Sequence, residues 1–160
     1  MKKQISFLRK RQTWRVVLLL ALAATAVFIV TRSMQSKTES NGESQWVTDL
    51  LRQLFRDETL SHAFVRKLAH FSEFFLLGAE LSGLLWLDNR FSPQWYINIW
   101  FAGLLWALCD ETVQIFSNRG PSVADVWLDA AGATCGILVL LGIRLLCKKI
   151  SGRKQIPHAK

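Results

Sequence analysis

Residues 123–146, VADVWLDAAGATCGILVLLGIRLL, form a nearly unbroken apolar stretch that decides the fold. Three other stretches have the same character, at residues 16–30, 64–87 and 95–116. Roughly 20 apolar residues span the hydrocarbon core of a bilayer, whereas a helix on the surface of a soluble domain keeps a polar face. The fold class we predict is therefore all-α, an integral membrane bundle of four transmembrane helices.

The positive charge of the chain lies at its two ends. Residues 1–15 and 144–160 each hold six of the 20 lysines and arginines and no acid, whereas residues 31–62 are close to neutral. Basic segments that flank transmembrane helices remain on the cytoplasmic side. We therefore expect cytoplasmic N and C termini and a multi-pass protein of the cell membrane. Basic residues at this location indicate contact with the lipid bilayer, and we expect no nucleic-acid partner.

The first apolar stretch also fits a signal peptide, because a basic start precedes a short apolar run. A retained helix is favoured, because the small residues Ala24 and Ala26 lie inside the run rather than after it. Residues 37–44 are polar and predicted to be flexible. Residues 46–55 have apolar side chains at helical spacing, which predicts an amphipathic helix. Two interpretations stay open: this helix lies on the outer membrane surface, or it packs on the loops of the bundle.

Many polar side chains fall inside or beside the last three stretches. They are Arg66, Lys67, His70, Glu73, Glu80, Asp110, Glu111, Gln114, Arg119, Asp125 and Asp129. A charge at mid-bilayer costs at least roughly 2.5–3.5 kcal/mol, so it usually faces a bundle interior or a water-filled cavity. At 1.5 Å per residue, Glu73, Asp110 and Asp129 all lie about 9–10 Å below the outer ends of their helices. Three helices are thus predicted to line one outward-facing polar cavity.

Spacing along each helix indicates which of these side chains share a face. Two pairs are one turn apart and should point the same way: Asp110 with Gln114, and Asp125 with Asp129. Glu111 points about 100° away from its neighbour and is expected to brace another helix. Glu80, which is nearer the inner half, is expected to make a separate structural contact.

Small residues recur four positions apart in two of the stretches. The pairs Gly78 with Ser82 and Gly132 with Gly136 predict close helix packing. The three cysteines show no spacing typical of a metal site and are predicted to be small apolar packing residues.

Three motifs in this order resemble the VanZ-like family, whose emblematic member raises bacterial tolerance of the glycopeptide antibiotic teicoplanin. They are KLAHFSEF at 67–74, DETVQIF at 110–116 and DVWLDAAG at 125–132. The resemblance covers about residues 60–145 and implies a role in the cell envelope. It suggests three parts: an N-terminal helix with an outer amphipathic loop (1–62), a VanZ-like three-helix core (63–147) and a basic cytoplasmic tail (148–160).

The cavity residues carry an excess of negative charge. Five acids (Glu73, Asp110, Glu111, Asp125 and Asp129) face three bases (Arg66, Lys67 and Arg119). Shared protons, a charged His70 or a bound cation must relieve this excess in a low dielectric.

Three functions remain open. In the first, the protein contributes to glycopeptide (teicoplanin-type) resistance. Its cavity then binds a lipid-linked cell-wall precursor or a lipoglycopeptide, with Lys67 and Arg119 on the phosphate or carboxylate of that ligand. Alternatively, the chain is a membrane enzyme acting on a lipid-linked phosphate by acid/base or divalent-metal chemistry. In the third, the polar residues only join helices. No cofactor is predicted, apart from the divalent cation that the enzyme hypothesis allows.

Overall fold

The computed structural model describes residues 2–56, 59–117 and 120–153, and these residues form five helices. They are α1 (Lys2–Ser33), α2 (Lys37–Phe55), α3 (His62–Leu87), α4 (Pro93–Phe116) and α5 (Val123–Arg153). All except α2 are long and apolar enough to cross a membrane. The prediction of an all-α bundle with four membrane-spanning helices is confirmed.

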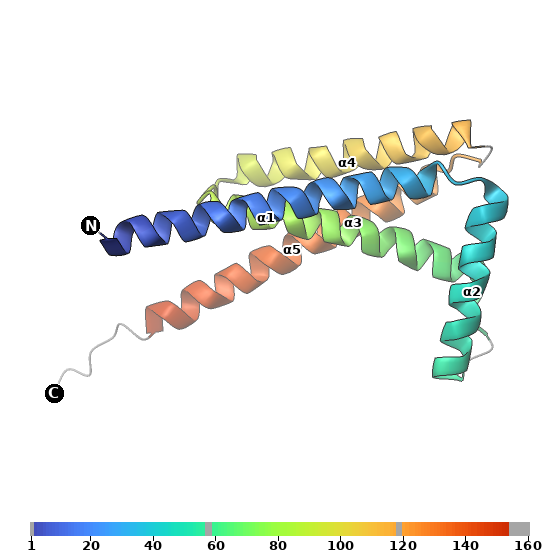
Figure 1. The fold of residues 1–160 in the computed structure, drawn as a ribbon, viewed down its shortest axis with the longest axis horizontal. Helices are drawn as coiled ribbons and strands as arrows, with labels where there is room; N and C mark the ends of the chain where they lie inside the picture. The colour runs from blue at the N-terminus through green and yellow to red at the C-terminus, as the bar shows by residue number, and fades with distance from the viewer. Residues whose placement is uncertain (1, 57–58, 118–119, 154–160) are drawn as a thin grey trace.

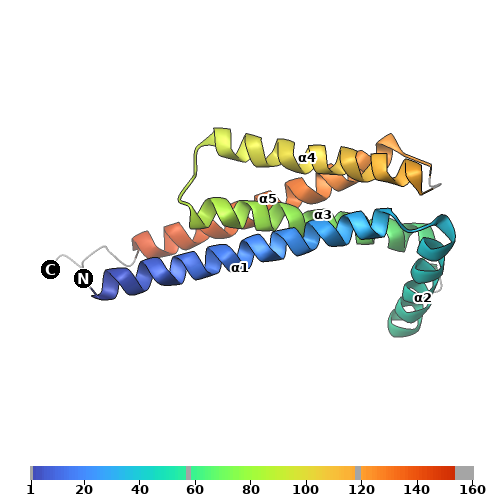
Figure 2. The same cartoon turned by 45° about the horizontal axis from the view of Figure 1, so that its top comes forward.

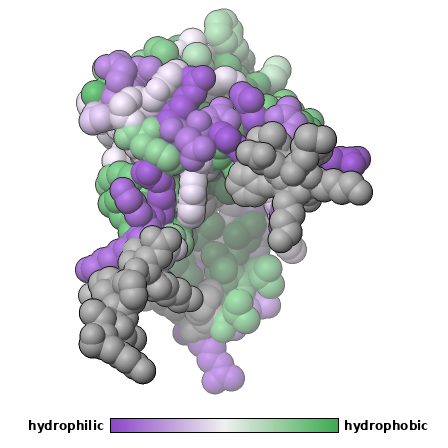
Figure 3. Space-filling model, turned by 90° about the vertical axis from the view of Figure 1, so that its left-hand side faces the viewer, coloured by the Kyte–Doolittle hydropathy of each residue, from purple (hydrophilic) through white to green (hydrophobic). Residues whose placement is uncertain are grey.

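The four long helices run along a common direction, and α2 lies across one end of them (Figures 1 and 2). The start of α1, the end of α5 and the connection between α3 and α4 lie at the opposite end. Hydrophilic side chains gather where that end faces the viewer (Figure 3). Both ends of the described chain therefore lie on one side of the bundle, as four crossings require. We call the other side the α2 end.

Helix α2 begins earlier than predicted, because residues 37–44 are helical rather than flexible. Ser36 and Glu39 form a capping box, in which the Ser36 side chain accepts from the Glu39 backbone N–H and Glu39 accepts from the Ser36 backbone N–H. The hydrogen bonds that the Glu39 carboxylate accepts, first from the Ser36 backbone N–H and then from the Ser36 hydroxyl, lower the pKa of this exposed carboxyl below its usual value. Farther along, Glu43 accepts from Arg32 of α1 and from Gln35. The helix cap and these side-chain contacts thus explain why residues 37–44 are helical although they lack apolar residues at helical spacing.

The amphipathic pattern of α2 has an unexpected orientation. Its buried side chains are the small polar residues Ser40, Ser44 and Thr48, spaced four apart, and two of them bond back to the backbone of their own helix. Three of its large apolar side chains are exposed: Trp46 by 68%, Leu50 by 49% and Leu54 by 71%. This orientation favours the interpretation in which the apolar face of α2 lies on a membrane surface.

Helices α3 and α5 pack so closely that only glycine fits at three positions between them. A Cβ at Gly78 would lie 2.1 Å from the Ala133 carbonyl oxygen, and one at Gly136 would lie 2.0 Å from that of Phe75. Gly132 faces the backbone of α3 in the same way. The predicted small-residue packing is confirmed, and it brings the polar stretches of α3 and α5 close together.

The apolar core lies between the polar site and the basic end. One cluster contains Ile29, Phe74, Leu77, Ala107 and Ala133, which come from all four long helices. Many apolar side chains on the outside of the bundle are exposed, as expected where lipid is the solvent. The cysteines belong to this outer surface: Cys109, Cys135 and Cys147 are all exposed. Their predicted role in helix packing is therefore wrong, because they lie on the sides of α4 and α5 that face away from the bundle.

Candidate functional site

The site lies at the α2 end of the bundle, where α3, α4 and α5 converge. Helix α3 supplies His70, α4 supplies Asp110, and α5 supplies Asp129. The His70 Nδ1 atom is 3.8 Å from Asp110 Oδ2 and 3.8 Å from Asp129 Oδ1. The two aspartates are 2% and 0% exposed, so protein shields both carboxylates from solvent. Of the residues predicted to line the cavity, the structure brings these three together, with His70 rather than Glu73 beside the two aspartates.

Asp110 is held in place from two directions. Its Oδ1 atom accepts a hydrogen bond from the Ser33 hydroxyl in the last turn of α1, and its Oδ2 atom accepts from Gln114 Nε2 at 2.9 Å. Gln114 is one turn along α4, as its spacing indicated. The contact from Ser33 was not predicted, because α1 showed no periodic polar pattern that would set which face it turns to the bundle.

Asp129 differs sharply from Asp110. It is fully buried, and neither of its carboxylate oxygens has a hydrogen-bond partner among the residues that the structure describes. Within the described ranges, each of the two aspartates lies 3.8 Å from the His70 Nδ1 atom. A buried carboxylate of this kind requires compensation by a proton or a cation.

Two of the predicted acids point elsewhere. Glu73 faces α1, where its Oε1 atom is 3.7 Å from Arg32 Nε. Glu111 accepts from the Ser122 backbone N–H at 2.8 Å and from Gln114 Nε2 at 3.0 Å. It thereby braces the start of α5, which is the bracing role expected for it. Arg32 is a second site residue that the sequence analysis missed.

Glu80 is also outside the site. It is buried deeper in the bundle, where it accepts a hydrogen bond of 3.0 Å from Thr25 of α1. The separate structural contact expected of Glu80 is confirmed. Arg119, predicted to line the cavity, lies outside the described residues.

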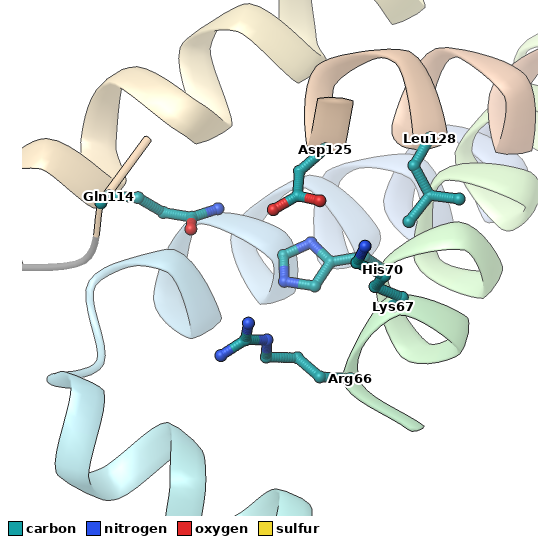
Figure 4. A pocket seen from close by; sticks show the side chains of 7 residues that line it. Arg66, Lys67, His70, Gln114, Asp125 and Leu128 are labelled. Carbon is teal, nitrogen blue, oxygen red and sulfur yellow. The ribbon is translucent and has the colours of Figure 1, made fainter. Parts of the chain in front are cut away.

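A cavity of about 210 Å³ opens beside the His70 group. It is lined by Arg66, Lys67, His70, Gln114, Gly120, Asp125 and Leu128. Figure 4 shows the Arg66 guanidinium, the His70 imidazole and the Asp125 carboxylate around one space, with the Gln114 amide reaching toward it from α4. His70 therefore belongs both to the buried group and to the cavity wall, and it connects the two.

A second, larger groove of about 520 Å³ lies between α1, α2 and α3. Its walls include the apolar side chains of Trp46, Val47, Val65 and Ala69, with Arg32, Glu43 and Arg66 among its polar members. Arg66 lines both this groove and the smaller cavity. The polar cavity and the largely apolar groove thus meet at Arg66.

Comparison with known proteins gives one match. A family model described as VanZ/LLP1 matches residues 14–146. No curated protein and no solved structure matches the chain. The match is longer than the 60–145 covered by the resemblance, because it begins in α1 and includes α2. It therefore includes Arg32 and Ser33, the two α1 residues that contact the site.

Proposed function

The chain belongs to the VanZ/LLP1 family of multi-pass membrane proteins, and from that premise we propose that it contributes to tolerance of teicoplanin-type glycopeptides in the cell envelope. In this proposal the α2 end faces outward, and its polar cavity binds the polar part of a lipid-linked cell-wall precursor or a lipoglycopeptide. The observation that carries the proposal is the mixed lining of the cavity, with two cations beside an acid and an amide.

Each part of that lining suits a part of such a ligand. Arg66 and Lys67 offer charge-assisted donors to a phosphate or carboxylate. Asp125 and Gln114 offer acceptors and a donor for sugar hydroxyls or amides. A few polar groups converging in a concave site are typical of ligand pockets.

The neighbouring groove supports an amphiphilic ligand. Its apolar walls, among them Trp46 and Val65, suit an acyl or prenyl chain, and Arg66 lies at the junction with the polar cavity. The exposed apolar face of α2 would keep this entrance at the level of the lipid headgroups. A headgroup and a chain of one molecule could then occupy both spaces together.

The proposal is tested by the teicoplanin tolerance of a bacterial host that produces each variant. Lys67→Ala and Arg66→Ala should each reduce the minimal inhibitory concentration toward that of cells without the protein, because the anionic group loses a donor. Arg90→Ala is the matched control, since Arg90 stacks on Trp95 at the opposite end of the bundle. It should leave tolerance unchanged.

Membrane abundance, measured by immunoblot in the same cells, separates binding from folding. Tolerance that falls only in proportion to abundance would assign the polar residues to helix joining, the structural alternative. Full tolerance in the Lys67 and Arg66 variants at normal abundance would reject the cavity as the binding site.

A second candidate function is an enzyme that acts on a lipid-linked phosphate. The buried group of His70, Asp110 and Asp129 favours it, because an imidazole beside two carboxylates suits acid/base or divalent-metal chemistry. Its test is phosphate release or transfer from a lipid-linked phosphate by purified protein in detergent. Conversion that is lost in His70→Gln would support the enzyme, and an inert wild-type protein would reject it.

A further inference from the structure

Three potential ligand atoms, one from each of three helices, meet at the base of the cavity. One ring nitrogen of His70 and one carboxylate oxygen each of Asp110 and Asp129 all lie within 4.8 Å of one another. We propose that these three side chains bind a divalent transition-metal ion. The proposal deepens the second candidate function by naming the ion and its ligands, and it is independent of catalysis and of which ligand occupies the cavity.

Asp129 is the observation that points to an ion. Its side chain is 0% exposed, and among the described residues neither of its oxygens accepts a hydrogen bond. The His70 Nδ1 atom lies 3.8 Å from Asp129 Oδ1, which is too far for a hydrogen bond. Because a buried carboxylate is stable only when it is paired, neutralised or coordinated to a metal, an ion between these groups would complete the site.

The spacing of the three groups suits coordination. An ion about 2.1 Å from each of two tetrahedral ligands holds those ligands about 3.4 Å apart. The two separations from His70 Nδ1 are 3.8 Å, so a small rotation of the side chains would close the site.

Outer contacts already position one of the carboxylates. Asp110 accepts hydrogen bonds from Ser33 and Gln114, as metal-binding carboxylates commonly do from neighbouring groups. Asp129 has no such contacts within the described chain and is the side chain free to turn toward an ion.

The donor set indicates the kind of ion. One imidazole nitrogen and two carboxylate oxygens suit Zn²⁺, Mn²⁺ or Fe²⁺ better than Ca²⁺ or Mg²⁺, which favour oxygen ligands alone. Glu73 would have made the set richer in oxygen, but it faces Arg32 instead. Three protein ligands leave further coordination positions open, and His70 lies on the cavity wall. A phosphate or water in the cavity could therefore reach the ion.

The test uses the full chain without a histidine tag, purified in detergent, treated with chelator and dialysed against Zn²⁺ or Mn²⁺. We expect about one ion per chain by elemental analysis, with an increase in the midpoint of thermal unfolding on reloading. Asp129→Asn and His70→Gln should each lose more affinity than the roughly 10–100-fold that loss of an outer contact costs. Glu80→Gln is the matched control, because Glu80 is a buried carboxylate of the same bundle outside the site.

Two site variants are used because, if one of them fails to fold, the other still tests the proposal. Wild-type protein that binds neither ion would overturn the proposal. So would equal loss of binding in Glu80→Gln, or full retention in both site variants. Binding that disappears only in Asp129→Asn and His70→Gln would establish the site.

Discussion

At the scale of single residues, Ser33 is the clearest test of how α1 supports the site. Its hydroxyl donates to the buried Asp110 carboxylate, across 77 positions of sequence. Ser33→Ala leaves one oxygen of Asp110 without this donor. We expect the free energy of unfolding to fall by about 1–3 kcal/mol, the usual cost of an unsatisfied buried polar group. Denaturant unfolding in detergent micelles measures this change.

Thr31→Ala provides the control for this prediction. Thr31 is an exposed hydroxyl residue two positions earlier in α1, and its hydroxyl donates to the Val27 carbonyl oxygen of its own helix. We expect its replacement to change the free energy of unfolding by no more than about 0.5 kcal/mol. Equal effects of the two substitutions would mean that the contact between Ser33 and Asp110 does not stabilise the bundle.

The same residues show how far sequence analysis reached at this scale. His70, Asp110 and Asp129 were predicted because charges inside apolar stretches are costly, and because helical rise fixes their depth. Ser33 and Arg32 were missed, because an uncharged serine gives no burial signal of its own and the arginine sits at the expected end of a span. Their role depends on the rotation of α1 about its axis, which local spacing does not determine.

At the scale of elements, the contact between α3 and α5 depends on glycine. In Gly136→Ala the new Cβ would lie 2.0 Å from the Phe75 carbonyl oxygen and 2.7 Å from the Ala79 nitrogen. Backbone atoms cannot move aside as a flexible side chain can, so the helices must separate. We expect a loss of about 1–3 kcal/mol or more in unfolding free energy, as for overpacked cores, together with lower membrane abundance.

Gly142→Ala is the matched control on the same helix, because a Cβ at Gly142 would have no atom within 4 Å. We expect it to be neutral or slightly stabilising, since alanine is the better helix former by about 1 kcal/mol. If Gly136→Ala were as well tolerated as Gly142→Ala, the close approach of α3 and α5 would not be required.

The spacing of small residues predicted the contact between α3 and α5, but it did not predict the helical start of α2. That start depends on the Ser36 cap and on the ion pair between Arg32 and Glu43.

At the scale of the whole molecule, function depends on which side of the membrane the α2 end faces. The first described turns of α1 and the last of α5 lie at the opposite end, where basic residues gather. The positive-inside rule assigns that end to the cytoplasm. The cavity would then open outward, where cell-wall precursors and glycopeptides are found. An inverted bundle would leave the fold intact but would place the cavity on the wrong side for the proposed ligands.

Labelling of single cysteines decides the orientation of the bundle. In a background with Cys109, Cys135 and Cys147 replaced by alanine, Gly120→Cys should react with a membrane-impermeant maleimide in intact cells. Gly120 is exposed in the connection to α5, at the α2 end, and a Cβ there would have no atom of the other described residues within 4 Å. Ser92→Cys is the control at the opposite end, where Ser92 is exposed and makes no capping hydrogen bond. It should react only after the cells are lysed.

The reverse labelling pattern would place the cavity on the cytoplasmic side. Direct contact between the cavity and an external glycopeptide would then be excluded, and the metal site would still be tested separately.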